Sequence, residues 1–106
     1  MLTRQVVHCK KEKFDVYIGR PSKWGNPFPL EDESERLEVI EQYRRWILMQ
    51  PKLLAVILEE LEGKVLGCWC APKPCHGNVL IGIIKGQRFM VDQFGASILD
   101  DYKNFP

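Results

Sequence analysis

The chain has 106 residues, enough for one domain with one modest core and too few for two. Its apolar fraction of 45% and its charged fraction of 27% are those of an ordinary globular protein and exclude an intrinsically disordered chain. Its 15 basic residues are nearly cancelled by 14 acidic ones, so the net charge of +1 gives no general argument for a nucleic-acid binder and leaves only a local basic patch open.

Two strands and an irregular loop are predicted at the start of the chain. Short β-prone runs lie in segments 5–9 and 14–19, on either side of a charged turn. Prolines, a glycine and an asparagine exclude regular structure from residue 20 to residue 30. We expect this loop to be ordered, because it is too aromatic for a flexible linker.

Two consecutive helices are predicted in the middle of the chain. Asp32 followed by Glu35 has the capping-box spacing, and a stripe of apolar residues at helical intervals carries the first helix to about Met49. Pro51 suits the first turn of the second helix, and Gly63 stands where a left-handed C-cap is expected.

A strand, a loop and a helix follow these two helices. Segment 64–70 predicts a strand, and prolines interrupt the chain at 71–74. Segment 77–85 carries apolar residues into another helix, which we expect to close near Gly86.

The end of the chain is expected to add little to the core. We predict a short edge strand at 88–91 and one or two helical turns at 96–102. The domain organisation is therefore a single α/β domain over 1–106, with a core in 1–86 and an edge strand or tail in 87–106.

The order of strand, helical crossover and strand predicts a parallel βαβ unit. Parallel strands end at the same edge of a sheet, so loops 19–28 and 68–78 should be neighbours although they are about fifty residues apart. The predicted fold is a small α/β domain with a mostly parallel, Rossmann-like sheet in two or three layers. Since open α/β sheets bind ligands at the carboxyl ends of their strands, the functional site is expected where these two loops meet.

The first loop carries candidate ligand-binding residues. Gly19 would let the chain leave its strand sharply, and Arg20 would then present a forked donor suited to phosphate or carboxylate, with Lys23 as a second charge. Trp24 is a candidate for stacking on a base, and Asn26 for reading the polar edge of that base. Trp24 is equally suited to capping the core. For Asn26 the sequence favours a structural role, in which it holds a left-handed turn before Pro27.

The second loop concentrates thiols, an indole and an imidazole. Cys68 and Cys70 are two residues apart on the predicted strand, so their side chains share one face while Trp69 points to the other. Cys75 and His76 follow at the start of a helix, where backbone N–H groups favour a thiolate or a bound anion. Trp69 is a further candidate for an aromatic platform beside the ligand.

Zinc is one interpretation of this cluster. Cys68, Cys70, Cys75 and His76 provide four donors of the kinds that zinc prefers, and Cys9 on the first strand is an alternative to His76. The spacing is unlike known zinc patterns, in which longer intervals separate the pairs of ligands. Cysteines that serve as small buried apolar residues are a further interpretation.

Catalysis is the other chemical interpretation. Cys75 would act as a nucleophile or His76 as a general base, while backbone amides at Gly77 and Asn78 hold the anionic part of the substrate. Nothing in the sequence directs the chain to an oxidising compartment or supplies the roughly 20 apolar residues of a membrane span, so we expect a cytoplasmic protein with no membrane partner.

Four runs of residues resemble a known family. They are 15–21 (DVYIGRP), 24–28 (WGNPF), 68–72 (CWCAP) and 75–77 (CHG), in this order. Together they are similar to a family of short bacterial and phage proteins known only as a domain of unknown function, over most of the chain up to about Ile84. The resemblance implies that the two loops define the family, and it implies no activity.

One residue departs from the pattern of that family. The family usually has an acidic residue after the Cys-His-Gly run, where this chain has Asn78. If the carboxylate serves as an acid, a base or a metal ligand in the family, that role is impaired or altered here.

We therefore expect this domain to bind a small anionic, nucleotide-like ligand at the strand-end site, a role that suits an enzyme of nucleotide or nucleic-acid metabolism. The alternative is a non-catalytic module in which zinc stabilises the same edge and the surface binds a protein or nucleic acid. A third interpretation is a thiol enzyme that acts on another metabolite. The sequence specifies neither the substrate nor the oligomeric state.

Overall fold

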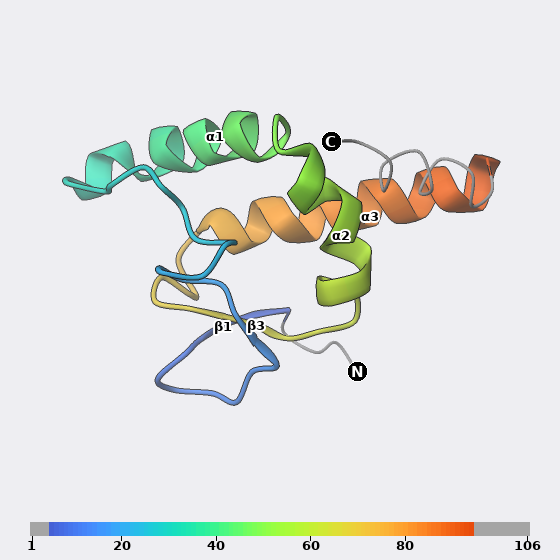
Figure 1. Cartoon of the computed structure of the whole chain (residues 1–106). Helices are drawn as coiled ribbons and strands as arrows, with labels where there is room; N and C mark the ends of the chain where they lie inside the picture. The colour runs from blue at the N-terminus through green and yellow to red at the C-terminus, as the bar shows by residue number, and fades with distance from the viewer. Residues whose placement is uncertain (1–4, 95–106) are drawn as a thin grey trace.

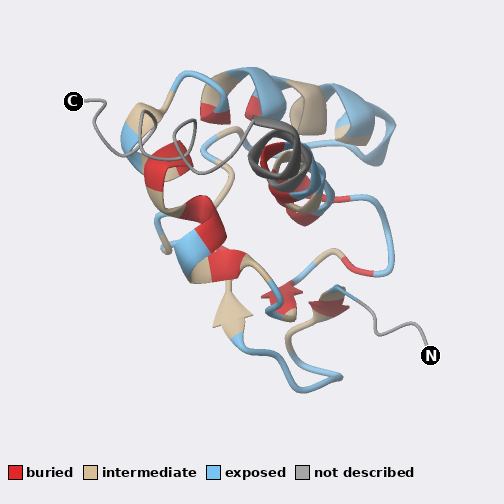
Figure 2. Ribbon diagram, turned by 90° about the vertical axis from the view of Figure 1, so that its right-hand side faces the viewer, coloured by how far each residue is buried: buried red, intermediate tan, exposed pale blue. Residues whose placement is uncertain are grey.

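The computed structural model describes residues 5–94, with side chains described to residue 87. Figure 1 shows the helices together on one side of the strands, and the view at right angles in Figure 2 agrees. The fold is a single α/β domain with two layers, so the two-layer form of the predicted fold is the one observed. The elements in chain order are β1 (Val6–His8), β2 (Val16–Tyr17), the 3-10 helix η1 (Glu33–Glu35), α1 (Arg36–Ile47), α2 (Pro51–Leu61), β3 (Leu66–Cys68) and α3 (His76–Phe94).

The three strands form one parallel sheet in the order β1-β3-β2. The most apolar strand, β3, is central, and all of its residues are buried. Leu66 lies between Val6 and Val16 in the register, and the chain continues the pairing beyond β2, where the Ile18 N–H donates to the Gly67 carbonyl oxygen at 2.9 Å. The predicted parallel pairing of the second and third strands is confirmed. It places the ends of β2 and β3 side by side.

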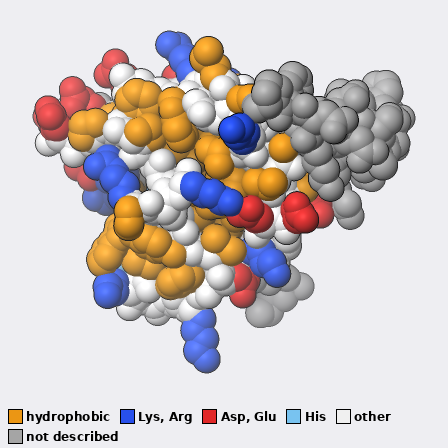
Figure 3. All heavy atoms as spheres, in the orientation of Figure 1, with side chains coloured by type: hydrophobic (Ala, Val, Ile, Leu, Met, Phe, Trp, Pro, Cys, Tyr) orange, Lys and Arg blue, Asp and Glu red, His pale blue; other side chains and the backbone are white. Residues whose placement is uncertain are grey.

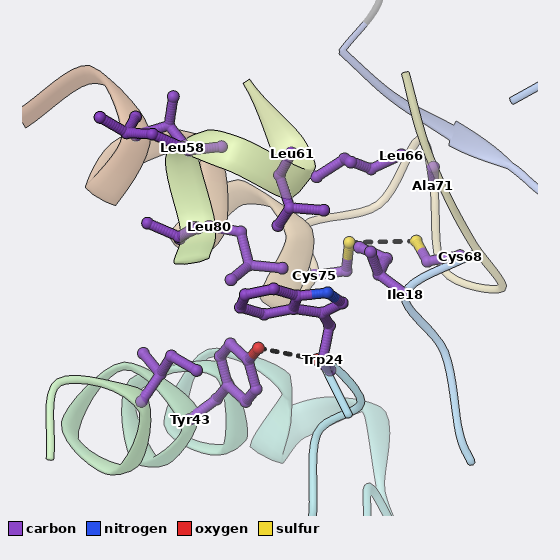
Figure 4. Packing of buried hydrophobic residues seen from close by; sticks show 13 residues of the cluster. Ile18, Trp24, Tyr43, Leu58, Leu61, Leu66, Cys68, Ala71, Cys75 and Leu80 are labelled. Carbon is purple, nitrogen blue, oxygen red and sulfur yellow. Dashed lines mark hydrogen bonds between the residues drawn. The ribbon is translucent and has the colours of Figure 1, made fainter. Parts of the chain in front are cut away.

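The core lies between the sheet and the helices. In Figure 4 the Trp24 indole lies between Tyr43 of α1 and Leu80 of α3, with Leu61 of α2 nearby. The Tyr43 hydroxyl donates to the Trp24 carbonyl oxygen at 2.7 Å, which satisfies a polar group that is buried with the ring. The loop after β2 is thus fixed to the helices by its own tryptophan.

Helix ends follow the signals in the sequence. Asp32 caps η1, and its Oδ1 accepts from the Ser34 N–H at 3.2 Å. Pro51 occupies the first turn of α2, and Gly63 after that helix has a φ of 75°, the left-handed conformation that glycine adopts without a steric cost. The expectations for Pro51 and Gly63 are confirmed. Asp32 begins the helical segment as predicted, but it caps η1, and Glu35, the N-cap of α1, makes no side-chain cap bond.

The predicted edge strand at 88–91 is wrong, because α3 continues as a helix to Phe94. Gly86 does not close the helix. It lacks the positive φ of Gly63, and a glycine inside a helix costs only about 1 kcal/mol relative to alanine. The predicted turns at 96–102 lie outside the described residues. Of the helices at 36–47, 51–61 and 76–94, none has the length and apolarity needed to cross a membrane.

Candidate functional site

The two loops meet around a pocket of about 300 Å³ at the carboxyl ends of β2 and β3. His76 at the start of α3 reaches the end of β2, and its Nε2 lies 2.7 Å from the Ile18 carbonyl oxygen. Each loop also contains one cis X-Pro peptide, at Pro21 and at Pro72. The predicted meeting of the two loops is confirmed. The pocket is lined by Tyr17, Gly19, Arg20, Asn26, Phe28, Leu30, Arg36, Val39, Ile40, Trp69, Cys70, Cys75 and His76.

Arg20 is held at the rim of the pocket by its own loop. Its Nε donates to the Asn26 carbonyl oxygen at 2.7 Å, and its Nη2 donates to the Phe28 carbonyl oxygen at 3.2 Å. A guanidinium has five N–H donors, so these two bonds orient the group and leave three donors for a ligand. Among the described side chains no carboxylate forms an ion pair with Arg20.

Asn26 has a structural role, as the sequence favoured, but the predicted left-handed turn is wrong, because no described residue other than glycine has a positive φ. Its Oδ1 accepts from the Phe28 N–H at 2.8 Å, and its Nδ2 donates to the Val39 carbonyl oxygen of α1 at 3.4 Å. Asn26 therefore joins the loop to α1. Although it lines the pocket, both functional atoms of its amide are already bonded within the protein.

An exposed indole forms the opposite wall of the pocket. Trp69 is 54% exposed, and its Nε1 donates to the Tyr17 hydroxyl at 2.8 Å. The same hydroxyl donates to the Arg20 carbonyl oxygen at 2.9 Å, so Tyr17 connects the two loops. A Cβ at Gly19 would overlap the Tyr17 hydroxyl, so a larger residue there would displace Tyr17 from the two hydrogen bonds that connect the loops.

The wall from α1 was not predicted. Arg36 binds the carboxylate of Glu33 through Nε and Nη2, and its Nη1 donates to the Pro74 carbonyl oxygen at 3.1 Å. Val39 and Ile40 line the same wall, because residues three and four positions after Arg36 share its face of the helix. That spacing was visible in the sequence, but the approach of α1 to the second loop was not.

Three of the thiols form one hydrogen-bonded chain beneath the pocket. The sulfurs of Cys68 and Cys75 are 3.1 Å apart, as Figure 4 shows, and Cys70 hydrogen-bonds to Cys68. Cys75 also accepts from the Gly77 N–H at 3.3 Å. Cys68 and Cys75 are almost completely buried, whereas Cys70 is half-buried and lines the pocket.

These contacts make Cys75 the first of the three thiols to ionise. The hydrogen bond from Cys68, with help from the Gly77 amide, lowers the pKa of Cys75 against the effect of burial. The hydrogen bond with Cys70 lowers the pKa of Cys68, but the bond to Cys75 and burial outweigh it and raise that pKa. The hydrogen bond with Cys68 and burial raise the pKa of Cys70.

The protonation of His76 follows from its partner. A carbonyl oxygen can only accept, so the proton lies on Nε2, and Nδ1 of the neutral ring remains an acceptor. Burial lowers the pKa of His76, which keeps the imidazole neutral near pH 7. The ring of Tyr43 packs edge-on against it at a centroid distance of 5.0 Å.

The described residues contain no group of three or more His, Cys, Asp or Glu side chains arranged to hold a metal ion. The His76 Nε2 is bonded to the Ile18 carbonyl oxygen, which leaves Nδ1 as the only ring nitrogen that could serve as a donor to a metal. Cys9, the alternative donor, follows β1 and donates its backbone N–H to the Cys68 carbonyl oxygen at 2.8 Å. Zinc therefore stays a prediction from the sequence.

Trp24 and Lys23 do not line the pocket. Trp24 is 2% exposed in the core, so of its two expected roles the structure gives it the core role, and stacking on a ligand is not available to it. Lys23 forms an ion pair with Glu60 at 2.7 Å, at the far end of α2. The loop thus directs Trp24 into the core and Lys23 toward Glu60 of α2, whereas Arg20 stays at the rim of the pocket.

Gly77 and Asn78 also lie outside the pocket lining. Gly77 lets α3 approach the sheet, since a Cβ there would come within 2.8 Å of Ile18. The Asn78 Oδ1 accepts from the Cys75 N–H at 2.8 Å and so caps the helix start. A carboxylate at this position could accept the same bond, so the acidic residue that the sequence resemblance leads us to expect here would also form the cap.

Comparisons with known proteins give the family of the chain and no activity. Residues 3–86 match the model of a family described as a domain of unknown function, DUF4326. The chain is also 37% identical over 93 residues to the "Uncharacterized 12.4 kDa protein in nrdA-td intergenic region" of Enterobacteria phage T4, an alignment that covers 85% of this chain and 83% of the relative. No solved structure matches the chain.

Proposed function

Since this chain belongs to the DUF4326 family, whose description gives no activity, we propose from the site itself that it binds a small anionic, nucleotide-like ligand. The observation that carries the proposal is the lining of the pocket between the loops. It combines the oriented Arg20, the exposed indole of Trp69 and a largely apolar wall, and none of the described residues that line it has a carboxylate. Such a lining favours a ligand with an anionic end and a flat ring.

Arg20 is the better of the two arginines for the anionic end. Arg36 is neutralised by Glu33, whereas Arg20 has unused N–H donors that are fixed in direction by the loop. Charge-assisted hydrogen bonds from a fork of this kind suit phosphate oxygens. The flat part of the ligand would then lie against Trp69 across the pocket.

An enzyme of nucleotide or nucleic-acid metabolism is the form of this function that the other lining residues support. His76 offers Nδ1 of a neutral imidazole, which suits a general base. Cys75 is the thiol with the lowered pKa, at the start of α3, which suits a nucleophile. Both residues line the pocket that would hold the anionic ligand.

The alternative function is a zinc-stabilised, non-catalytic module that binds a protein or nucleic acid. One observation favours it. Cys68, Cys70 and Cys75 lie in one hydrogen-bonded chain, so three donors of a kind that zinc prefers are already close together, although they and a fourth donor, Cys9 or His76, would have to rearrange to form a tetrahedral site. Metal content separates the two functions.

Ligand-dependent thermal stability tests the proposed function. Adenosine, adenosine 5′-monophosphate and inorganic phosphate are compared on the wild type, Arg20→Ala and Arg20→Lys, with Lys23→Ala as the matched control. We expect the monophosphate to stabilise the wild type more than adenosine does, and Arg20→Ala to lose most of that difference. Lys23→Ala should behave as the wild type, because Lys23 lies outside the pocket. If the monophosphate stabilised the wild type and Arg20→Ala equally, Arg20 would not be the anion-binding residue and the proposed anion site would be wrong.

A further inference from the structure

Four rings form a continuous chain across the end of the sheet. The Phe14 and Tyr17 rings have centroids 6.4 Å apart, and the His8 and Trp69 rings 5.8 Å apart. The hydrogen bond of 2.8 Å from Trp69 to the Tyr17 hydroxyl joins the two pairs. We call these four residues the aromatic platform.

The helices do not cover this platform. Leu66 and Cys68 of β3 point into the core beneath the helices, so Gly67 between them faces the opposite side of the sheet. The Phe14 ring lies directly on Gly67, where a Cβ would come within 2.6 Å of it. Phe14 is 38% exposed and Trp69 is 54% exposed, so both side chains are partly accessible to a partner, although Lys10 lies over the Trp69 ring.

Lysines surround the platform. Lys10 Nζ lies 5.4 Å from the centroid of the Trp69 ring, and Lys11 and Lys13 follow in the same exposed turn between β1 and β2. None of these three lysines pairs with a carboxylate among the described side chains. Figure 3 shows hydrophobic side chains gathered over the strand end of the molecule, with Lys and Arg side chains at their margin. Glu12 lies in the same turn, so three lysines stand against one carboxylate at residues 10–13, and the local charge is positive although the chain is nearly neutral.

We propose that the aromatic platform binds single-stranded nucleic acid. Exposed rings offer stacking surfaces to unpaired bases, and the unpaired lysines offer their charge to the phosphates between them. Tyr17 and Trp69 belong to both the platform and the pocket lining, so the strand runs from the pocket mouth onto the sheet. The inference rests on the proposed function in that the pocket holds the nucleotide at one end of the strand.

Charge complementarity favours this occupant over a second copy of the chain. Two platforms brought face to face would place Lys10, Lys11 and Lys13 of one copy against those of the other, which is repulsive. A polyanion with planar groups would pair its charges with the lysines and stack its planar groups on the aromatic rings. The source of the strand, DNA or RNA, is left to the test.

Binding of labelled single-stranded oligonucleotides, followed by fluorescence anisotropy, tests the platform. Wild type is compared with Phe14→Leu, which retains an apolar cover over Gly67, and with the double variant Lys11→Gln/Lys13→Gln. Lys52→Gln, an exposed lysine at the start of α2, is the matched control. DNA, RNA and duplex DNA probes of equal length are used, with adenosine 5′-monophosphate as the ligand for the pocket alone.

The expected results distinguish the contribution of the aromatic rings to strand binding from the contribution of the lysine charges. Single strands should bind more tightly than either the duplex or the monophosphate, and Phe14→Leu should weaken single-strand binding about 5- to 150-fold. The double lysine variant should lower the slope of log affinity against log salt by about 1.4, from about 0.7 for each lost phosphate contact. Lys52→Gln should change neither quantity.

The outcomes distinguish this inference from the proposed function. Phe14, Lys11 and Lys13 do not line the pocket, so monophosphate binding should survive all of these variants. If single strands bind no more tightly than the monophosphate, or if the variants leave their affinity and salt slope unchanged, the platform is overturned and the pocket stands. Strands that bind through Phe14 while the monophosphate does not bind would overturn the pocket instead. Self-association that Phe14→Leu abolishes, without strand binding, would assign the platform to a second copy and overturn the inference.

Discussion

The two tryptophans of the site loops give the most informative pair of substitutions. Trp24 is 2% exposed in the core, whereas Trp69 is 54% exposed at the pocket. Trp24→Phe removes about three buried heavy atoms at about 0.8 kcal/mol each, and so should lower the free energy of unfolding by about 2 kcal/mol. Trp69→Phe removes an exposed hydrogen bond to Tyr17 and should cost at most about 1 kcal/mol.

Urea unfolding followed by far-ultraviolet circular dichroism measures both effects. At a slope of about 1.5 kcal/mol per molar urea, Trp24→Phe should lower the midpoint by about 1–2 M and Trp69→Phe by less than about 0.7 M. Ligand binding should show the reverse order: Trp69→Ala should weaken nucleotide binding about 5- to 150-fold, while folded Trp24→Phe binds as the wild type. Equal midpoints for the two phenylalanine variants, or a binding defect in folded Trp24→Phe, would refute the assignment of Trp24 to the core and Trp69 to the site.

Three further predictions concern the start of α3 and the thiols. Asn78→Ala should lower the free energy of unfolding by about 1 kcal/mol, because the bond to the Cys75 N–H is lost. Asn78→Asp keeps an acceptor there and should be neutral or stabilising by about 0.3–1 kcal/mol. Thermal unfolding measures both variants, and an alanine variant as stable as the aspartate variant would contradict the cap. Burial lowers the pKa of His76 below its ordinary value of 6.5, so the unfolded chain binds more protons there and the free energy of unfolding should fall as the pH decreases from about 7 to 5. Urea unfolding across this range should give a flatter dependence for His76→Gln, and identical slopes would count against the neutral buried imidazole. Elemental analysis separates the two proposed functions: zinc-free protein and a folded Cys70→Ser variant are expected if the nucleotide site is the functional unit. One equivalent of zinc, lost together with folding in Cys70→Ser, would favour the zinc module instead.

Much of the fold could be predicted because local signals and chain direction agree. A β-prone run, a capped helix pair and a second β-prone run allow little besides a parallel unit, and this alone brings Arg20 and His76 together. The error lay at the end of α3, where Gly86 was taken as a stop. A glycine ends a helix only if its backbone adopts the left-handed conformation, as Gly63 does, and nothing in the local sequence distinguishes the two residues.

The composition of the site was less predictable than its location. The loop from Gly19 to Phe28 contains both Arg20, which faces the pocket, and Trp24, which faces the core, and only the packing of the helices decides which residue turns inward. Arg36 was missed for the same reason. Its place in the pocket depends on the approach of α1 to the Pro74 carbonyl oxygen, a contact between segments 38 residues apart.

The central claim is that the ends of β2 and β3 form one ligand site with the first turn of α1. A titration of ¹⁵N-labelled protein with adenosine 5′-monophosphate, followed by amide chemical shifts, tests it most directly. We expect saturable shifts in segments 17–28 and 68–76 and near Arg36, with little change along α2. Shifts confined to α2 or to the far end of α3, or no shifts at millimolar ligand, would contradict the claim.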